Sequence, residues 1–228
     1  MRYELIIDTV LPGRTYEYLD RFASINRSSE EGVALEGCWT TDDDTAYSGF
    51  GTLNQVFHLW SSPTAGGAVA VSGDPGGIVV SRQVDVLTPA PFMKNIEPQA
   101  TWSMYELAID TVRPGTLQQV MAAWERGLAD RVRHGPLAGC WTSEADNVHR
   151  VFHLWGCPGL RNRERIRNQS WKPGVWPPAR EALLAQENRL LIPALFAADE
   201  NNRDNLAAAL ASTAPTYAPK AVAGKAPG

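Results

Sequence analysis

Apolar and polar residues alternate near the start of the chain and then change to a helical period. Residues 3–10 alternate, are rich in β-branched side chains and stop at Pro12-Gly13, which predicts a strand. Apolar residues then recur at intervals of three and four over 18–25, and again over 117–128, which predicts two helices. Two hairpins are predicted after these helices, at 37–41 with 54–60 and at 139–143 with 149–155.

The same pattern occurs twice in the chain. Residues 3–13 (YELIIDTVLPG) and 105–115 (YELAIDTVRPG) are identical at nine of eleven positions. Two further matches follow in the same order, LEGCWTT with LAGCWTS and VFHLW with VFHLW, at 35–41 and 137–143 and at 56–60 and 151–155. Three ordered matches indicate an internal duplication.

The duplication divides the chain into four expected parts. They are a first repeat at 1–92, a linker at 93–103, a second repeat at 104–198 and an Ala/Pro-rich tail at 199–228, whose start at 199–212 could form a helix.

Each repeat is expected to have the β-α-β-β-α-β order of a ferredoxin-like unit. In the second repeat we expect a charged helix at 160–169, another helical piece at 179–187 and a last strand at 189–192. The Gly-rich segment 61–80 of the first repeat predicts a second helix that is short, distorted or absent.

The fold class predicted from this order is α+β. A ferredoxin-like sheet carries helices on one face only, so its other face must be buried. Two copies in one chain can bury these faces against each other. We therefore predict two ferredoxin-like repeats that close into an intramolecular α/β barrel.

Composition limits the classes of partner and the cellular location that we expect for the chain. The formal net charge is −4, which disfavours nucleic acid, and no apolar run is long enough to cross a membrane. The N-terminus has no signal-peptide pattern, so a cytoplasmic protein is expected. Three cysteines without CxxC spacing support neither a disulfide framework nor a zinc site, and we expect no metal.

The opening strand, the GCWT and VFHLW motifs with their spacing, the Arg-rich helix and the final strand ending in Pro-x-x-Phe resemble the NIPSNAP family. That family belongs to the dimeric α/β barrel superfamily, so the resemblance implies a ferredoxin-like unit that pairs into a barrel. The superfamily includes cofactor-independent monooxygenases, polyketide cyclases, isomerases and haem enzymes. The resemblance therefore implies a fold and leaves the substrate open.

Strand alternation sorts the candidate site residues. If Phe57 and Leu59 face the helices, then His58 and Trp60 point into the barrel, as do their copies in the second repeat. The expected catalytic residues are His153, His58, Glu106 and Glu4. The expected substrate-binding residues are Trp155, Trp60, Trp141, Trp39, Asp110, Asp8 and Arg165.

Each candidate also has a structural interpretation. A strand histidine is often a hydrogen-bonded core residue, and a buried glutamate can pair with an arginine. Asp8 and Asp110 precede Pro-Gly turns and could cap them. The arginines over 161–167 could form a solvated helix face or bind an anion or a partner.

Two functions follow from these candidates. The first is an enzyme that acts on a small hydrophobic or aromatic metabolite inside the barrel, by acid/base chemistry without a cofactor. Its reaction would be an isomerisation, a cyclisation or an oxygenation. The alternative is a non-catalytic ligand-binding or protein-interaction module, which a filled barrel would favour. A homodimer is possible in either case.

Overall fold

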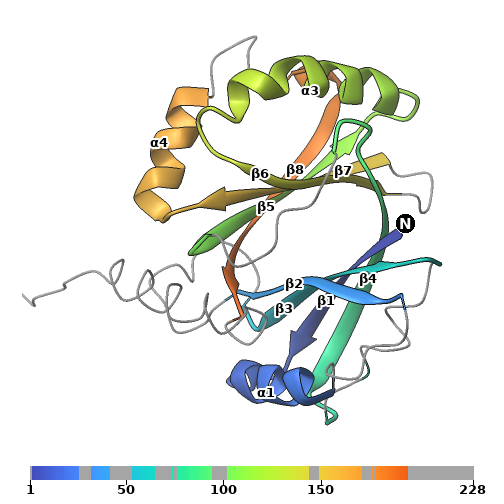
Figure 1. Ribbon diagram of the computed structural model, residues 1–228, viewed down its shortest axis with the longest axis vertical. Helices are drawn as coiled ribbons and strands as arrows, with labels where there is room; N and C mark the ends of the chain where they lie inside the picture. Colours follow the sequence, from blue (N-terminus) through green and yellow to red (C-terminus); the bar gives the residue numbers. More distant parts are fainter. Residues whose placement is uncertain are drawn as a thin grey trace, which may run out of the picture.

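The computed structural model describes residues 2–25, 32–41, 53–64, 73, 76–93, 102–143, 149–170, 176 and 178–194 (Figure 1). The elements of the first half are β1 (Arg2–Val10), α1 (Thr15–Ile25), β2 (Ala34–Thr40), β3 (Gln55–Ser62) and β4 (Val79–Pro89). Those of the second half are β5 (Met104–Val112), α3 (Leu117–Arg131), β6 (Leu137–Ser143), β7 (His149–Cys157), α4 (Leu160–Ser170) and β8 (Leu183–Pro193), with a short 3-10 turn at Arg180–Ala182.

The strands form one closed antiparallel barrel in the order β1-β3-β2-β8-β5-β7-β6-β4. Figure 1 shows α1 outside the strands of the first half, and α3 and α4 outside those of the second. The predicted α+β barrel is therefore confirmed. None of the described helices is long and apolar enough to cross a membrane.

The two halves have the same strand register. Asp8 lies opposite Val56 on β3, and its copy Asp110 lies opposite Val151 on β7. The halves join at two short seams, β2 with β8 and β4 with β6. The β2–β8 seam pairs Trp39 and Thr40 with the last two residues of β8. Because backbone pairing at the seams is short, side chains inside the barrel contribute much of the contact between halves.

The barrel interior is a packed apolar core. Leu5, Phe57 and Leu59 meet their copies from the second half there, and they are all buried. Rings also touch across the halves, such as Trp39 on Tyr105 with centroids 5.8 Å apart. The space left inside is about 10 Å³, less than one water needs.

This packing reverses the predicted strand faces. Phe57 and Leu59 face the interior, whereas His58 and Trp60 face α1. The prediction of a ligand inside the barrel is therefore wrong for the described residues. Polar side chains lie instead on the outer face, between sheet and helix, where they bond with one another.

Steric crowding explains why the GCW motif begins with glycine in both repeats. In each repeat the tryptophan ring lies over the glycine two residues earlier in the same strand. A Cβ on Gly139 would stand 1.9 Å from Cη2 of Trp141, and one on Gly37 would stand 2.2 Å from Cη2 of Trp39. Only glycine leaves room for the ring to enter the interior.

The helix predicted at 179–187 is wrong, because β8 begins at Leu183 and pairs along β5. The charged helix at 160–169 is confirmed as α4. Most of the expected linker, the tail and the segment 65–72, where the second helix of the first repeat was in question, lie outside the described residues.

Candidate functional site

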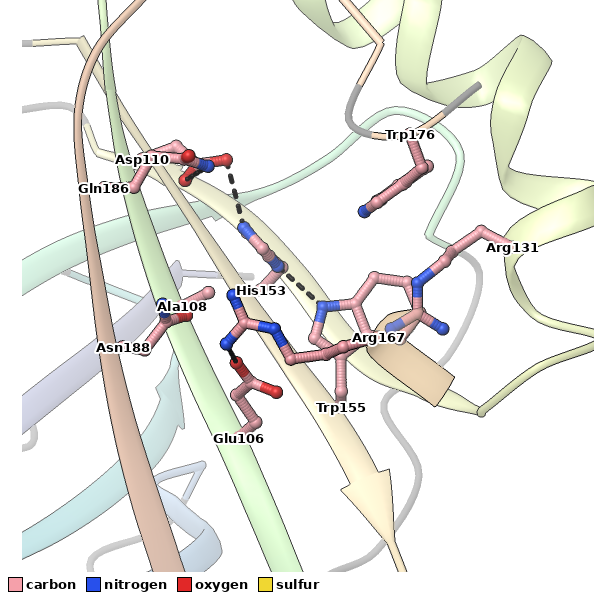
Figure 2. A pocket seen from close by; sticks show the side chains of 10 residues that line it. All are labelled: Glu106, Ala108, Asp110, Arg131, His153, Trp155, Arg167, Trp176, Gln186 and Asn188. Carbon is pink, nitrogen blue, oxygen red and sulfur yellow. Dashed lines mark hydrogen bonds and ion pairs between the residues drawn. The ribbon is translucent and has the colours of Figure 1, made fainter. Parts of the chain in front are cut away.

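A small polar pocket lies on the outer face of the sheet in the second half (Figure 2). Its volume is about 60 Å³, enough for a few waters or for the polar end of a larger molecule. Strands β5, β7 and β8 form its floor, and helices α3 and α4 contribute arginines. The lining residues are Glu106, Ala108, Asp110, Arg131, His153, Trp155, Arg167, Trp176, Gln186 and Asn188.

Asp110, His153 and Trp155 form a chain of hydrogen bonds across the pocket floor. His153 lies two residues after Val151, the partner of Asp110, so both side chains emerge on the same face. Nε2 of His153 is 3.2 Å from Oδ2 of Asp110, and Nε1 of Trp155 is 2.6 Å from Nδ1 of His153. Figure 2 shows the imidazole between the carboxylate and the indole.

This chain fixes the tautomer of His153. An indole N–H can only donate, so Nδ1 must accept and the ring proton sits on Nε2, facing Asp110. Both ring nitrogens are therefore engaged. In this arrangement His153 orients and supports the carboxylate, and it has no free lone pair to take a proton from a ligand.

Asp110 is a buried carboxylate whose hydrogen bonds come from neutral donors. Besides His153, Nε2 of Gln186 donates to Oδ1 at 2.9 Å. Burial tends to raise the pKa of Asp110, but the interactions with His153 and the Gln186 bond outweigh it and lower that pKa overall. The carboxylate is therefore ionised at neutral pH.

Glu106 is held by two arginines of α4. Arg163 forms a bidentate pair with it at 2.9 Å for both bonds, and Arg167 adds a contact of 3.2 Å. Arg165 lies on the exposed face of the same helix, where it bonds Gln169 and Asn162. The structure therefore places Arg165 outside the pocket.

Arg131 ends α3 beside two tryptophans. Its guanidinium carbon lies 3.8 Å from the ring centre of Trp155 and 5.8 Å from that of Trp176. The side chain is buried, and its Nε and Nη1 atoms have no hydrogen-bond partner among the described residues. Burial lowers the pKa of Arg131 to about 10, which still leaves it charged at neutral pH.

The first half contains the same aspartate–histidine–tryptophan chain, but there Tyr18 and Arg82 also bond the aspartate. We call this chain of Asp8, His58 and Trp60 the sealed copy. Nε1 of Trp60 is 2.7 Å from Nδ1 of His58, whose Nε2 is 3.3 Å from Oδ2 of Asp8. Tyr18 of α1 donates to the same carboxylate at 2.6 Å, and Arg82 of β4 forms two bonds of 2.6 Å with it. Asp8 therefore has its charge paired with Arg82, whereas the described donors to Asp110 are neutral groups.

Burial also shifts the pKa values of the titratable groups in and around the sealed copy. It lowers the pKa of His58 and raises that of Tyr18, so both groups stay neutral. Burial alone would raise the pKa of Asp8, but the bonds from Arg82 and His58 outweigh it and hold that pKa well below its usual range. Neither aspartate needs a turn-capping role to explain its burial.

The predicted site residues thus divide into three groups. Glu106, Asp110, His153 and Trp155 come together in the pocket. Asp8, His58 and Trp60 form the sealed copy beneath α1, and Glu4 is buried on the same face. Trp39 and Trp141 lie inside the barrel, away from both histidines. They were expected to line the same space as the histidines. Their rings do lie inside the barrel, above the motif glycines, whereas the histidines face the helices.

Six pocket residues were not among the expected catalytic and substrate-binding residues: Ala108, Arg131, Arg167, Trp176, Gln186 and Asn188. A signal existed for Arg131, which lies seven residues after Trp124 and so shares the buried face of the helix. An arginine on the apolar side of an amphipathic helix is unusual enough to be a candidate.

A pH dependence follows from Asp8. Its pKa is lower in the folded state than the value of about 3.9 expected when unfolded, so its bonds stabilise the fold above that pH and lose this contribution in acid. Asn does not titrate. The gap in unfolding free energy between wild type and Asp8→Asn should therefore be widest above pH 5 and shrink below pH 4, by up to about 1.4 kcal/mol per pH unit. Urea titrations at pH 6, 4 and 3 measure it, and a constant gap would contradict the role of Asp8.

Comparisons with known proteins agree with this architecture. A sequence model of the NIPSNAP family matches residues 105–198. NipSnap homolog 2 of Danio rerio is 24% identical over 194 residues, which covers 76% of this chain and 65% of that protein. NipSnap homolog 2 of Homo sapiens is 28% identical over 120 residues, 51% of this chain and 42% of that protein. The chain thus spans about half of the length of these relatives.

Solved structures show the same fold. The crystal structure of an anthrone oxidase-like protein superposes with a TM-score of 0.61, covering 85% of this chain and 91% of that one at 10% identity. At that identity the likeness concerns the barrel fold alone. The family match covers the repeat that carries the open pocket, and residues 105–198 of this chain therefore belong to the NIPSNAP family.

Proposed function

We propose that the second half of the chain is an enzyme that removes a proton from a small molecule bound in the polar pocket. Asp110 accepts the proton, and His153 and Gln186 are positioning residues that orient its carboxylate. The observation that carries this is the contrast between the two copies. Asp8 is neutralised by Arg82, whereas Asp110 lines a pocket and its described hydrogen bonds come from neutral donors.

The pKa of Asp110 limits the substrate. A carboxylate with a lowered pKa is a weak base, so it suits a carbon acid already activated by a neighbouring carbonyl group, or an acidic phenol. A ligand that displaces pocket water would make Asp110 more basic, because desolvation disfavours the charged carboxylate. Isomerisation, aldol-type cyclisation and cofactor-free oxygenation all begin with such a proton removal.

The fold is compatible with this chemistry. A protein of the same fold is described as anthrone oxidase-like, which suggests phenolic or polyketide-like molecules as candidates to screen. The pocket holds only part of such a molecule, so the remainder would extend outside it.

The test uses the protein with a pool of small metabolites in D₂O and mass spectrometry as the readout. Proton removal from carbon leaves a deuterium in a recovered or isomerised product, dehydrative cyclisation loses the mass of water, and oxygenation adds that of oxygen. We expect wild type to change at least one metabolite and Asp110→Asn to slow that change by about 100-fold or more. The control is Arg126→Met, on the exposed face of α3.

Two outcomes would contradict the proposal. Conversion by Asp110→Asn at the wild-type rate would remove Asp110 from the chemistry. A pool that is bound but never changed in mass would favour the non-catalytic ligand-binding module. Circular dichroism of both variants shows whether they are folded.

A further inference from the structure

The arginine at the end of α3 has hydrogen-bonding atoms that the described residues leave unpaired. Arg131 is 8% exposed, and its Nε and Nη1 have no partner. A buried guanidinium normally bonds a carboxylate or several carbonyl oxygens, because leaving its N–H groups unpaired is costly. Arg163, on the neighbouring helix, follows that rule by its two bonds to Glu106.

Stacking explains only part of this placement. The ring of Trp155 lies 3.8 Å from the guanidinium carbon, and a cation over an aromatic face is attracted to it. That attraction acts on the face of the guanidinium, however, whereas N–H donors point outward in its plane. The tryptophan therefore holds Arg131 in place without pairing its N–H donors. Nε and Nη1 are shielded from solvent, and the guanidinium reaches the pocket as one of its lining residues.

The charges around the pocket have a definite balance. Arg131, Arg163 and Arg167 carry one positive charge each, and Glu106 and Asp110 carry one negative charge each, while His153 is neutral in the tautomer set by Trp155. Among these groups one positive charge remains uncompensated. Arg163 and Arg167 both contact Glu106, so the excess falls on Arg131.

We propose that Arg131 binds a carboxylate group of the ligand, so that the pocket takes a small monoanionic carboxylic acid. This rests on the proposed function only in placing the ligand in the same pocket, and it concerns binding rather than turnover. A single negative charge cancels the excess on Arg131, whereas a phosphate dianion would exceed it. The 60 Å³ of space suits a group of carboxylate size.

Arg131 also sets the orientation of such a ligand. It enters the pocket from α3 beside Trp155 and Trp176, whereas Asp110 lies at the other end of the hydrogen-bond chain through His153 (Figure 2). A ligand that places its carboxylate on Arg131 keeps this negative group away from Asp110 and turns its remaining atoms toward that base. The expected substrate is therefore a short carboxylic acid with an acidic C–H or O–H group beyond its carboxylate.

The experiment measures binding of acetate to the purified full chain. Sodium acetate replaces sodium chloride at constant ionic strength, and thermal unfolding gives the apparent dissociation constant. We expect a saturable rise in melting temperature for wild type and for Arg126→Met. The Arg131→Met variant should bind acetate at least ten-fold more weakly, and Arg131→Lys should lie between them because it keeps the charge without the planar fork. Sodium phosphate at the same ionic strength should stabilise wild type less than acetate does.

Two further readouts separate this proposal from its alternatives. Without acetate, Arg131→Met should melt no lower than wild type, because the substitution removes a buried unpaired charge. Asp110→Asn should bind acetate at least as well as wild type, since it removes a negative charge, even where it abolishes turnover. Acetate binding by Asp110→Asn would therefore support the carboxylate site at Arg131 even if no catalysed reaction were found.

The proposal is overturned if acetate stabilises wild type and Arg131→Met to the same extent, or if it stabilises neither. It is also overturned if phosphate alone stabilises wild type through Arg131. A large drop in the melting temperature of acetate-free Arg131→Met, together with no acetate effect on wild type, would assign Arg131 to packing.

Discussion

Asp8→Ala is expected to lower the free energy of unfolding by about 3–5 kcal/mol, because it removes the partner of a largely buried charge. Asp8 accepts two hydrogen bonds from Arg82, one from Tyr18 and one from His58. The matched change Asp110→Ala removes two bonds from neutral donors and is expected to cost about 1–3 kcal/mol. The two copies of one aspartate should thus differ in their effect on stability.

Equilibrium urea unfolding at pH 7 measures both changes. Asp8→Asn keeps an oxygen acceptor and should fall between wild type and Asp8→Ala. Equal losses for the two alanine variants would mean that the first half does not rely on its ion pair. It would also remove the contrast on which we base the proposal that the second half is the working one.

Phe152→Ala is expected to lower the free energy of unfolding by about 3–5 kcal/mol, because it leaves a cavity in a tightly packed core. Phe152 is fully buried inside the barrel, among apolar side chains from both halves. The seams between the halves are short, so the interior has little means to collapse around the gap without disturbing the pairing.

Urea unfolding also tests this change. The comparison variant is Leu184→Ala, on β8, whose side chain is 55% exposed and whose loss should change stability by about 0.5 kcal/mol or less. If Phe152→Ala cost less than about 1 kcal/mol, the barrel interior would be loosely filled. An apolar ligand inside it would then have to be reconsidered.

Much of the fold could be predicted from the sequence, because the two copies confirm one another. The opening strands, both hairpins and the charged helix all lie where the repeated motifs place them. The strand faces could not be assigned in this way. In β3 and β7 nearly every residue is buried, so alternation sorts side chains into two sets without saying which set meets the helices. Hydrogen bonding decides it, since His58 bonds Trp60 on the outer face, and Asp8 bonds Tyr18 and Arg82 there, whereas the interior is mostly apolar.

Local preference also misled the assignment near the C-terminal end of the second repeat. Residues 179–187 contain alanine, leucine and glutamate, which favour helices. In the fold the second half of this segment, from Leu183 on, pairs with β5, and the pairing outweighs the preference. The same pairing brings Gln186 opposite Asp110. That residue of the pocket could not be foreseen without the register of β8.

The candidate site was only partly foreseeable for a related reason. His153, Asp110, Trp155 and Glu106 were found because they recur or alternate, but their roles depend on distances. The hydrogen bond from Trp155 occupies Nδ1 of His153, which is why we propose that this expected base is a positioning residue. Among the arginines of α4, residues 163 and 167 reach Glu106, whereas Arg165 points to solvent, because a helix turns about 100° per residue.

The closed barrel also bears on how copies of this protein can associate. An open sheet exposes a row of unpaired backbone groups at each end, and another chain can add a strand there. In this fold the seams β2–β8 and β4–β6 pair both ends within one chain. Strand addition would therefore first have to break a seam. If a homodimer forms, its subunits should meet through helix surfaces or the outer face of the sheet, and each would keep its own complete barrel.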